Sequence, residues 1–381
     1  MNMEPIFHTC TSASAGDHVS LILKITGSTC NLDCAYCFEK RRDYPIHRTI
    51  DVDMVAKAIS HLSAYRLSIE LHGGEPLLMG VSRISQMLDV ISSVRPDAPI
   101  RLQTNATLLN DEWCSLFQRF TQLSIGVSFD GFGKSNIWRY FNSSQPSDDD
   151  ALSGIGILIR NQLSFGLICV VNKSNQYNFC EYLDWASTIP GLKVVRFLPC
   201  FDQDVALSPT VPRNALTQSY YESSNPESRW AINFDDYVIF TKSAYSYWKQ
   251  KRYFRIFGLD PAGEFLKKLT HGKCSTCHME TTKCNHTITL YPDQTFSSCD
   301  ELENSSRIPM PAGDDGTNPF SYVLNGLSKA FSSDLLRACA ACDVRQICNG
   351  GCPAIRNRYA GSDPLGYCKM QKELISFFAA P

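Results

Sequence analysis

Three cysteines on one short segment could do chemistry together. Cys30, Cys34 and Cys37 follow an apolar run and have the spacing C-x3-C-x2-C. Three thiolates on one loop can bind three irons of a 4Fe-4S cluster, which leaves the fourth iron free to bind a small molecule. Structural zinc is the alternative, but such sites normally need four ligands, and the nearest histidine, His47, lies ten residues after Cys37. The spacing therefore favours a cluster with an open iron.

A second set of cysteines lies near the C-terminus. Nine of the 17 cysteines of this 381-residue chain fall between Cys274 and Cys368. Four of them have the spacing C-x2-C-x5-C-x3-C, which is too regular for scattered core residues: Cys339, Cys342, Cys348 and Cys352. The odd total fits poorly with a closed disulfide framework, so metal or cluster ligation is the better interpretation. A zinc ribbon remains the alternative here, because C-x2-C pairs also suit zinc.

Alternating apolar and amphipathic runs predict the elements that position these cysteines. From Val19 to about Pro199 this alternation indicates β-α units around a parallel sheet. The predicted strands are Leu21–Thr26, Leu67–Leu71, Ile100–Thr104, Leu123–Phe129, Leu167–Val171 and Val194–Leu198. The predicted helices are Asp51–Tyr65, Val81–Val94, Asp111–Phe120, Asp149–Gln162 and Asn178–Thr188. Six consecutive units predict an α/β fold with a partial (β/α)6 barrel.

Polar segments follow several of the predicted strands. The second strand is followed by Gly73-Gly74-Glu75-Pro76, in which the glycines allow a close backbone approach and Glu75 can accept hydrogen bonds from an ammonium group. The other such residues are Gln103, Asn105, Ser128, Arg139, Asn172, Arg196 and Pro199. Each segment could be ordinary turn chemistry, but active sites of barrels gather at the carboxyl ends of the strands. We therefore expect these residues around one site, with Asn172, Arg196 and Pro199 shaping a substrate cavity.

Composition and charge limit the function classes. The chain has 36 Lys+Arg against 38 Asp+Glu, a formal charge of −2, which argues against nucleic acid and anionic membranes as partners. We find neither a membrane span nor a secretory signal, so we expect a cytoplasmic protein. The expected organisation is an N-terminal extension at 1–18, a barrel at 19–200, a bridging helical segment at 201–270 and a cysteine-rich domain at 271–381.

The first cysteine loop resembles the signature of the radical S-adenosylmethionine (SAM) enzymes, which have an aromatic residue before the last cysteine, here Tyr36. The resemblance implies that the open iron chelates SAM and that reductive cleavage gives a 5′-deoxyadenosyl radical. It also implies that an external donor such as flavodoxin or ferredoxin supplies the electron. The implied SAM-binding residues are Tyr36, Gly73, Gly74, Glu75, Gln103, Asn105, Ser128 and Arg139. Of these, Ser128 and Arg139 are the better candidates for the ribose and the carboxylate of SAM.

The C-terminal cysteines resemble the SPASM extension of radical SAM enzymes, which generally carries two auxiliary 4Fe-4S clusters. The resemblance implies one cluster at Cys277, Cys284, Cys299 and Cys352 and another at Cys339, Cys342, Cys348 and Cys368, with Cys274 as an alternative to Cys277. One departure is that the pattern's glycine falls on Gln294, where Asp293-Gln294 can still form a turn between two short strands. The simplest interpretation of Cys169 and Cys200, and with less support of Cys10, Cys114 and Cys180, is as small core residues.

Members of this group mostly modify peptides, and the resemblance implies a precursor peptide as the partner, recognised by the bridge and the barrel rim. The C-terminal cysteine segment is most similar to maturases of ribosomal peptides that join an aromatic ring carbon to an aliphatic β-carbon, which forms a cyclophane. The alternatives are oxidation of Ser or Cys to formylglycine in a sulfatase, or another peptide modification such as thioether formation. Asp300 matches the position of the base in sulfatase-maturating members, although it could merely hydrogen-bond the cysteine loop. A further alternative is a cluster or zinc protein without catalysis.

Overall fold

The structure is a computed structural model that describes residues 12–41, 46–201, 229–302, 307–311, 317–326, 333–359, 363 and 365–380. Its first part confirms the predicted β-α alternation. The strands are β1 (His18–Lys24), β2 (Arg66–His72), β3 (Ile100–Thr104), β4 (Leu123–Ser128), β5 (Phe165–Val171) and β6 (Leu192–Pro199). The helices that connect them are α1 (Val52–His61), α2 (Val81–Val94), α3 (Asp111–Gln118), α4 (Asp148–Arg160) and α5 (Phe179–Ala186). All six predicted strands and five predicted helices are present, with ends that differ by a few residues.

Helix α1 shows why these segments fold as predicted. The Asp51 carboxylate accepts hydrogen bonds from the backbone N–H groups of Asp53 and Met54, which satisfies donors that have no partner within the helix. Val55 and Ile59 lie one turn apart and are fully buried against the sheet. The cap therefore sets the start of α1, and the apolar stripe sets the face that packs.

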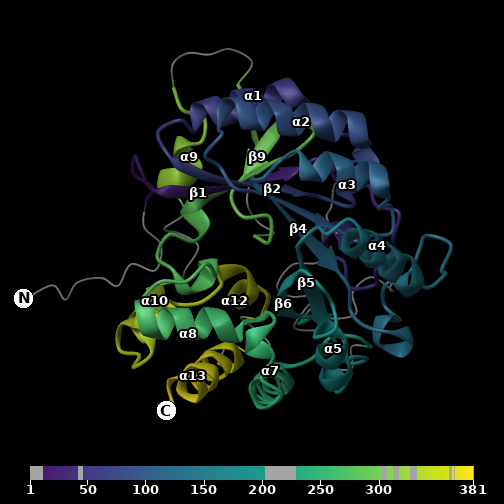
Figure 1. The fold of residues 1–381 in the computed structure, drawn as a ribbon. Helices are drawn as coiled ribbons and strands as arrows, with labels where there is room; N and C mark the ends of the chain where they lie inside the picture. The colour runs from purple at the N-terminus through teal and green to yellow at the C-terminus, as the bar shows by residue number, and fades with distance from the viewer. Residues whose placement is uncertain are drawn as a thin grey trace, which may run out of the picture.

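One sheet forms the framework of the molecule, and its strands β1 to β6 are parallel. Strands β1 to β6 pair in sequence order, and β1 and β2 pair in register so that Lys24 lies opposite His72 at their carboxyl ends. In the part of the chain that the structure describes, β7 (Gly258–Asp260) and β10 (Ile308–Pro309) are the edge strands of this sheet, which is therefore an open, partial barrel. Helices α1, α2 and α3 cover its outer face, as Figure 1 shows. The carboxyl ends of β1 to β6 thus face one common region.

The C-terminal part of the chain joins the same sheet. Strand β8 (Thr287–Leu290) pairs in parallel with β1. Strand β9 (Thr295–Ser297) pairs antiparallel with β8, and β10 (Ile308–Pro309) pairs antiparallel with β9. The predicted turn between two short strands is present, and Gln294 has a positive φ of 64°, a backbone conformation that favours glycine. The sheet therefore continues into the segment predicted as a separate cysteine-rich domain.

The predicted bridging segment contains a helix and also a strand that the sequence pattern does not indicate. Helix α7 (Phe234–Gln250) confirms the predicted helical run, and β7 (Gly258–Asp260) extends the sheet beside β6. At three residues, β7 is too short to show an alternating pattern. Positions 202–228 of the predicted bridge lie outside the described residues. The domain boundaries remain a prediction.

Helices pack around the C-terminal cysteines. Helix α8 (Ala262–His271) and helix α13 (Gly366–Ala379) lie near α10 (Ser333–Ala340), α11 (Arg345–Cys348) and α12 (Pro353–Tyr359), below the sheet in Figure 1. Phe265 of α8 stacks on Phe378 of α13 with ring centroids 5.2 Å apart. None of the helices in the described ranges is long and apolar enough to cross a membrane.

Candidate functional site

The loop after β1 carries Cys30, Cys34 and Cys37, and the Gly73-Gly74 segment supports it. The Gly74 N–H donates to the carbonyl of Gly27 at 2.8 Å, and the Glu75 N–H donates to the carbonyl of Thr29 at 2.9 Å. A Cβ atom on Gly74 would overlap the carbonyl oxygen of Thr29. The sequence predicts that these glycines allow a close backbone approach. In the structure, the group that approaches them is the backbone of the cysteine loop.

Glu75 joins the ends of two strands. Its carboxylate is 1% exposed and accepts hydrogen bonds from the N–H of Leu77 at 3.1 Å, the hydroxyl of Thr104 at 2.7 Å and the N–H of Asn105 at 2.8 Å. Burial raises the pKa of Glu75, and these donors oppose that rise. The structure thus gives Glu75 a role in holding β2 to β3, and its contact with SAM remains a prediction.

The other predicted ligand-binding side chains on β3 and β4 lie in contact. Asn105 is 6% exposed, and its amide donates to the Asn31 side chain at 2.9 Å, inside the cysteine loop. The amide of Gln103 donates to the Ser128 hydroxyl at 2.7 Å across neighbouring strands. Asn105 therefore contacts the cysteine loop, and Gln103 contacts the end of β4.

Arg139 and Tyr36 share a buried network with Asp130, a residue that we did not predict in the site. The Tyr36 hydroxyl donates to the Asp130 carboxylate, and Arg139 Nη1 donates to that hydroxyl at 3.1 Å. Burial raises the pKa of Asp130, and Arg139 opposes the rise. Burial alone would lower the pKa of Arg139, but its interactions with Tyr36, Cys34 and Asp130 raise it well above its ordinary value. Arg139 is therefore a cation held beside the cysteine loop.

Asp300 lies in a buried ionic cluster at the carboxyl ends of β1 and β2. The Lys24 ammonium is 2.5 Å from the Asp300 carboxylate, also pairs with Glu39 and lies 3.0 Å from His72 Nδ1. Lys24 is 1% exposed and the Asp300 side chain is 9% exposed. Burial lowers the pKa of His72, and Lys24 lowers it further, so the neutral ring can accept from Lys24. Asp300 is thus tied to the barrel, although it comes from the C-terminal part of the chain.

Glu39, His72 and Asp300 are near enough to one another to hold a metal ion. Lys24 Nζ already lies among their ligand atoms, so the positive centre of this cluster is the lysine ammonium. Sequence reasoning missed Lys24, Glu39 and His72. One signal was available, because Lys24 interrupts the apolar run at positions 21–25, and a lysine within such a run is rarely buried without a partner.

The first predicted set of four cysteines gathers in one place. Burial and the neighbouring Cys352 raise the pKa of the Cys277 thiol to about 12, although Cys277 as a whole residue is exposed. Burial also raises the pKa of Cys299 well above its ordinary value, and the charges of Asp300, Cys277, Cys352 and Cys284 add to the rise. Thiolates this close to one another repel, so all four cysteines can be ionised together only around a positive centre. The set therefore fits a metal cluster.

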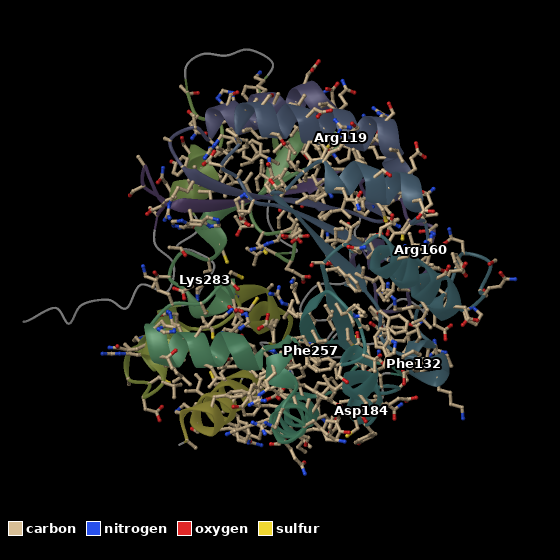
Figure 2. All side chains as sticks on the ribbon, viewed as in Figure 1. Arg119, Phe132, Arg160, Asp184, Phe257 and Lys283 are labelled. Atoms are coloured by element: carbon tan, nitrogen blue, oxygen red, sulfur yellow. The ribbon has the colours of Figure 1, made fainter. Side chains whose placement is uncertain are left out.

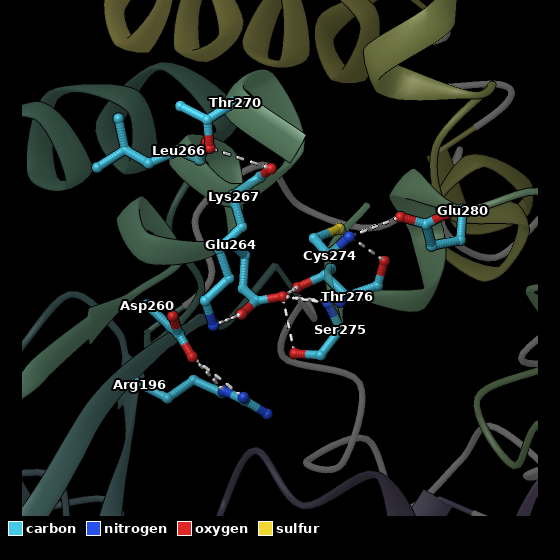
Figure 3. A network of polar contacts seen from close by, with 10 residues as sticks. All are labelled: Arg196, Asp260, Glu264, Leu266, Lys267, Thr270, Cys274, Ser275, Thr276 and Glu280. Atoms are coloured by element: carbon cyan, nitrogen blue, oxygen red, sulfur yellow. Dashed lines mark hydrogen bonds and ion pairs between the residues drawn. The ribbon is translucent and has the colours of Figure 1, made fainter. Parts of the chain in front are cut away.

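Cys274 faces a different environment. Its N–H donates to the Glu280 carboxylate at 2.8 Å, and its thiol lies 3.6 Å from the Thr276 carbonyl. Glu264 of α8 accepts from the backbone N–H groups of Ser275 and Thr276, which anchors this loop, as Figure 3 shows. Cys277 is thus the better placed of the two alternatives, and its ligation remains a prediction.

The second predicted set also gathers. Burial raises the pKa of Cys339, with added effects of Cys368 and Cys342, and burial raises the pKa of Cys348 to about 11, with added effects of Cys339 and Cys368. Arg356 lowers both pKa values and donates from Nη1 to the Cys368 thiol at 3.2 Å. This set likewise suits a cluster, with a cation beside it.

The remaining predicted residues line other parts of the barrel. Arg196 pairs with Asp260 of β7 at 3.1 Å, and Asn172 is fully buried, with its side-chain oxygen accepting from the Ser174 N–H. Pro199 ends β6. Cys114, Cys169 and Cys200 are buried, as expected for core residues, and Cys180 is partly buried. Cys10 lies outside the described residues.

Comparisons with known proteins agree on one family. A family model described as the radical SAM superfamily matches residues 25–186. The serine-type anaerobic sulfatase-maturating enzyme of Klebsiella aerogenes is 25% identical over 372 residues, which cover 93% of this chain and 85% of that protein. The cysteine-type enzyme of Clostridium perfringens (strain 13 / Type A) is 23% identical over 388 residues, covering 94% and 96%.

Solved structures share the fold. The structure of native anSMEcpe with bound AdoMet superimposes with a TM-score of 0.73 at 19% identity, covering 94% of this chain and 96% of that one. Streptococcus suis SuiB bound to precursor peptide SuiA has a TM-score of 0.58 at 13% identity, covering 88% and 72%. Residues 25–186 therefore form a radical SAM domain.

Proposed function

We propose that the chain is a peptide maturase that abstracts a hydrogen atom from a side-chain β-carbon of a ribosomal precursor peptide and joins that carbon to an aromatic ring of the same peptide. The position of Asp300 carries this proposal. Asp300 follows Cys299 directly in the sequence. Its carboxylate is held by Lys24 at the carboxyl end of β1, the strand from which the Cys30 loop begins. A base there lies between the two cysteine-bearing parts of the chain.

The cofactors would be held by residues that the fold brings together. Cys30, Cys34 and Cys37 would hold the cluster that binds SAM, and the two sets of four C-terminal cysteines would hold auxiliary clusters. Around the first loop, Arg139 offers a planar fork for the SAM carboxylate, and Gln103 and Ser128 offer polar groups for the ribose. Loaded with these groups and reduced by a donor of the flavodoxin or ferredoxin class, the protein would cleave SAM to a 5′-deoxyadenosyl radical and would take up one surplus electron.

The reaction requires a base once the hydrogen atom has been removed. The β-carbon of the peptide loses one hydrogen atom to the adenosyl radical and forms a bond to a ring carbon. The ring then loses one proton and one electron to become aromatic again, so the peptide loses two hydrogens in total. Asp300 accepts the proton, and the Lys24 ammonium stabilises the carboxylate in the ionised form that can accept it.

An aromatic cluster at the ends of β4 to β6 supports an aromatic substrate residue: Trp230 is buried in it, whereas Trp138 is partly exposed and Arg229 is exposed. Trp138 and Trp230 are in edge contact with centroids 5.4 Å apart, and the Arg229 guanidinium lies 5.8 and 5.7 Å from their rings. This group packs against Tyr36 of the cysteine loop. Aromatic and cationic side chains attract an aromatic ring by offset stacking and cation–π contact.

Oxidation of Ser or Cys to formylglycine is the second candidate, because the two sulfatase-maturating relatives match almost the whole chain. Both reactions begin with removal of a β-hydrogen and end with loss of a proton and an electron. The same Asp300 would then act on the substrate carbon that becomes the aldehyde. The two candidates therefore differ in the product rather than in the base.

Tandem mass spectrometry after anaerobic co-expression separates the candidates. The enzyme is co-expressed with the short peptides encoded beside its gene and, in parallel, with a sulfatase peptide that contains Ser or Cys. A precursor peptide that loses two hydrogens, does not react with a hydrazide probe and contains a block of residues that resists fragmentation supports the cross-link. A hydrazide-reactive sulfatase peptide with an unchanged precursor would instead support formylglycine and contradict the cross-link.

A further inference from the structure

Lys283 is a buried cation whose ammonium contacts backbone carbonyls rather than solvent. The residue is 1% exposed. Its Nζ donates to the carbonyl oxygens of His278 at 3.1 Å, Asn349 at 2.5 Å and Gly351 at 3.1 Å. Figure 2 labels Lys283 in the region where the sheet meets the C-terminal helices. The three carbonyl dipoles compensate this buried ammonium for the loss of water.

The three carbonyls belong to residues that adjoin cysteines of both predicted sets. His278 follows Cys277 and Gly351 precedes Cys352, both of the first set, while Asn349 follows Cys348 of the second set. Asn349, Gly350 and Gly351 all have positive φ, between 48° and 80°, in the turn that separates Cys348 from Cys352. The Lys283 ammonium therefore contacts the backbone beside both sets of cysteines.

One other cation distinguishes the two sets. Arg356 of α12 touches the second set, because its Nη1 donates to the Cys368 thiol at 3.2 Å, and its guanidinium lies 4.7 Å from the Tyr367 ring centroid. Each set also has a carboxylate beside it. Asp300 Oδ1 lies 4.0 Å from the Cys299 thiol of the first set, and Asp343 Oδ1 lies 3.6 Å from the Cys342 thiol of the second set. Both carboxylates have a cationic partner, Lys24 and Lys372 respectively, so the contact of Arg356 with Cys368 is the charge that distinguishes the second set from the first.

A reduced iron-sulfur cluster carries one more negative charge than the oxidised one, so a nearby cation or an N–H donor to sulfur raises the reduction potential and a nearby anion lowers it. We infer that Arg356, whose guanidinium donates to the Cys368 thiol, makes the cluster at Cys339, Cys342, Cys348 and Cys368 the stronger electron acceptor of the two auxiliary clusters. This inference rests on the proposed function, which places a cluster at each set. With both clusters bound, the four cysteines of the second set would hold the group that retains the surplus electron, and an acceptor of the flavodoxin or ferredoxin class would remove it.

The midpoint potentials of the auxiliary clusters test the inference. A redox titration followed by electron paramagnetic resonance is made on the full-length, cluster-loaded protein in which the Cys30 loop is silenced by Cys30→Ala, Cys34→Ala and Cys37→Ala. Cys368→Ser, which alters the second cluster, assigns the two signals. We expect the second cluster to have the more positive potential. Arg356→Gln should shift that potential in the negative direction and leave the first unchanged, whereas Arg356→Lys should retain most of the wild-type value.

Two further variants complete the test. Lys283→Gln should shift both potentials in the negative direction, and Lys242→Gln, which removes an ion pair with Glu373 at 3.3 Å on the outer helices, should shift neither. A second cluster whose potential equals or lies below that of the first overturns the inference, even if a variant fails to assemble. Iron and sulfide analysis precedes the titration, and a protein without auxiliary clusters would contradict their place in the proposed function before any potential is compared.

Discussion

Lys24 is the residue through which the barrel holds Asp300. Its position opposite His72 follows from the register of β1 and β2, and its contacts with Glu39 and Asp300 fix two carboxylates at the ends of these strands. Removing one partner of a buried ion pair leaves an uncompensated charge, so the remaining carboxylates would move or take up protons. The base would then lose both its position and its ionised form.

We predict that Lys24→Met uncouples the reaction. SAM cleavage should continue, because the Cys30 loop and the Arg139 network are unchanged, but the amount of modified peptide per 5′-deoxyadenosine should fall by about 10²-fold, the usual contribution of a general base. Both products are quantified by mass spectrometry. Lys57→Met, which removes a contact to the Pro311 carbonyl from the outer helix α1, is the control and should keep the wild-type ratio. An unchanged ratio in Lys24→Met would show that Asp300 needs no partner.

The sequence predicts part of this site and not the rest. Cysteine spacing indicates the metal-binding loop directly, because thiolates at C-x3-C-x2-C have few other uses. The roles of Asp130, His72 and Glu39 could not be predicted, because a lone polar residue at a strand end or in a loop has many ordinary explanations. Their contacts arise only when the ends of separate strands are placed side by side.

At the scale of elements, the Gly73-Gly74 segment and the cysteine loop form one unit. We predict that Gly74→Ala displaces the carbonyl of Thr29 and weakens the neighbouring cluster site, so that the purified protein loses about four irons, those of one cluster. Iron analysis measures the loss. Gly156→Ala in α4, where a Cβ meets nothing within 4 Å, should keep the full iron content and stabilise the fold by about 0.5–1 kcal/mol. Full iron in Gly74→Ala would refute this role.

Helix α8 positions the loop of the first C-terminal cysteine set. Burial alone would raise the pKa of Glu264, but hydrogen bonds from Lys267 and Ser275 lower it from 4.5 to about 2. A lowered pKa in the folded state means that the contribution to stability is present above about pH 4.5 and is lost as the pH falls towards 2.

We therefore predict that Glu264→Gln lowers the free energy of unfolding at pH 7 by about 2–3 kcal/mol, measured by urea denaturation. The difference from wild type should shrink as the pH falls below about 4.5. Glu112→Gln, an exposed residue on α3, is the control and should change the free energy of unfolding by less than about 0.5 kcal/mol. An equally small effect in Glu264→Gln would mean that the loop does not depend on this anchor.

At the scale of the whole molecule, β8 covers the edge of β1. The six β-α units could be predicted because each has a local pattern, but the pairing of β8 with β1 joins residues more than 260 positions apart, such as Ser20 and Thr287. No local signal in a four-residue strand specifies such a partner. The same pairing brings Cys299 and Asp300 to the end of the barrel.

We predict that a chain ending at residue 270 aggregates, because β1 would become an exposed edge with unpaired backbone groups. Size-exclusion chromatography and the soluble yield measure this. The control is the full-length chain with Cys339, Cys342, Cys348 and Cys368 changed to Ser, which keeps β8 and should remain more soluble than the truncated chain. A monodisperse truncated chain would show that β1 needs no such cover.

The most direct test of the account is deuterium transfer from a precursor peptide labelled at its side-chain β-carbons. We predict that the wild-type enzyme moves deuterium into 5′-deoxyadenosine and forms the cross-linked peptide. Asp300→Asn should transfer the same label and form little or no cross-link. The adenosyl radical still removes the hydrogen atom from the β-carbon, but no base removes the proton from the aromatic ring. Absence of label in 5′-deoxyadenosine with the wild-type enzyme, or full cross-linking by Asp300→Asn, would contradict the account.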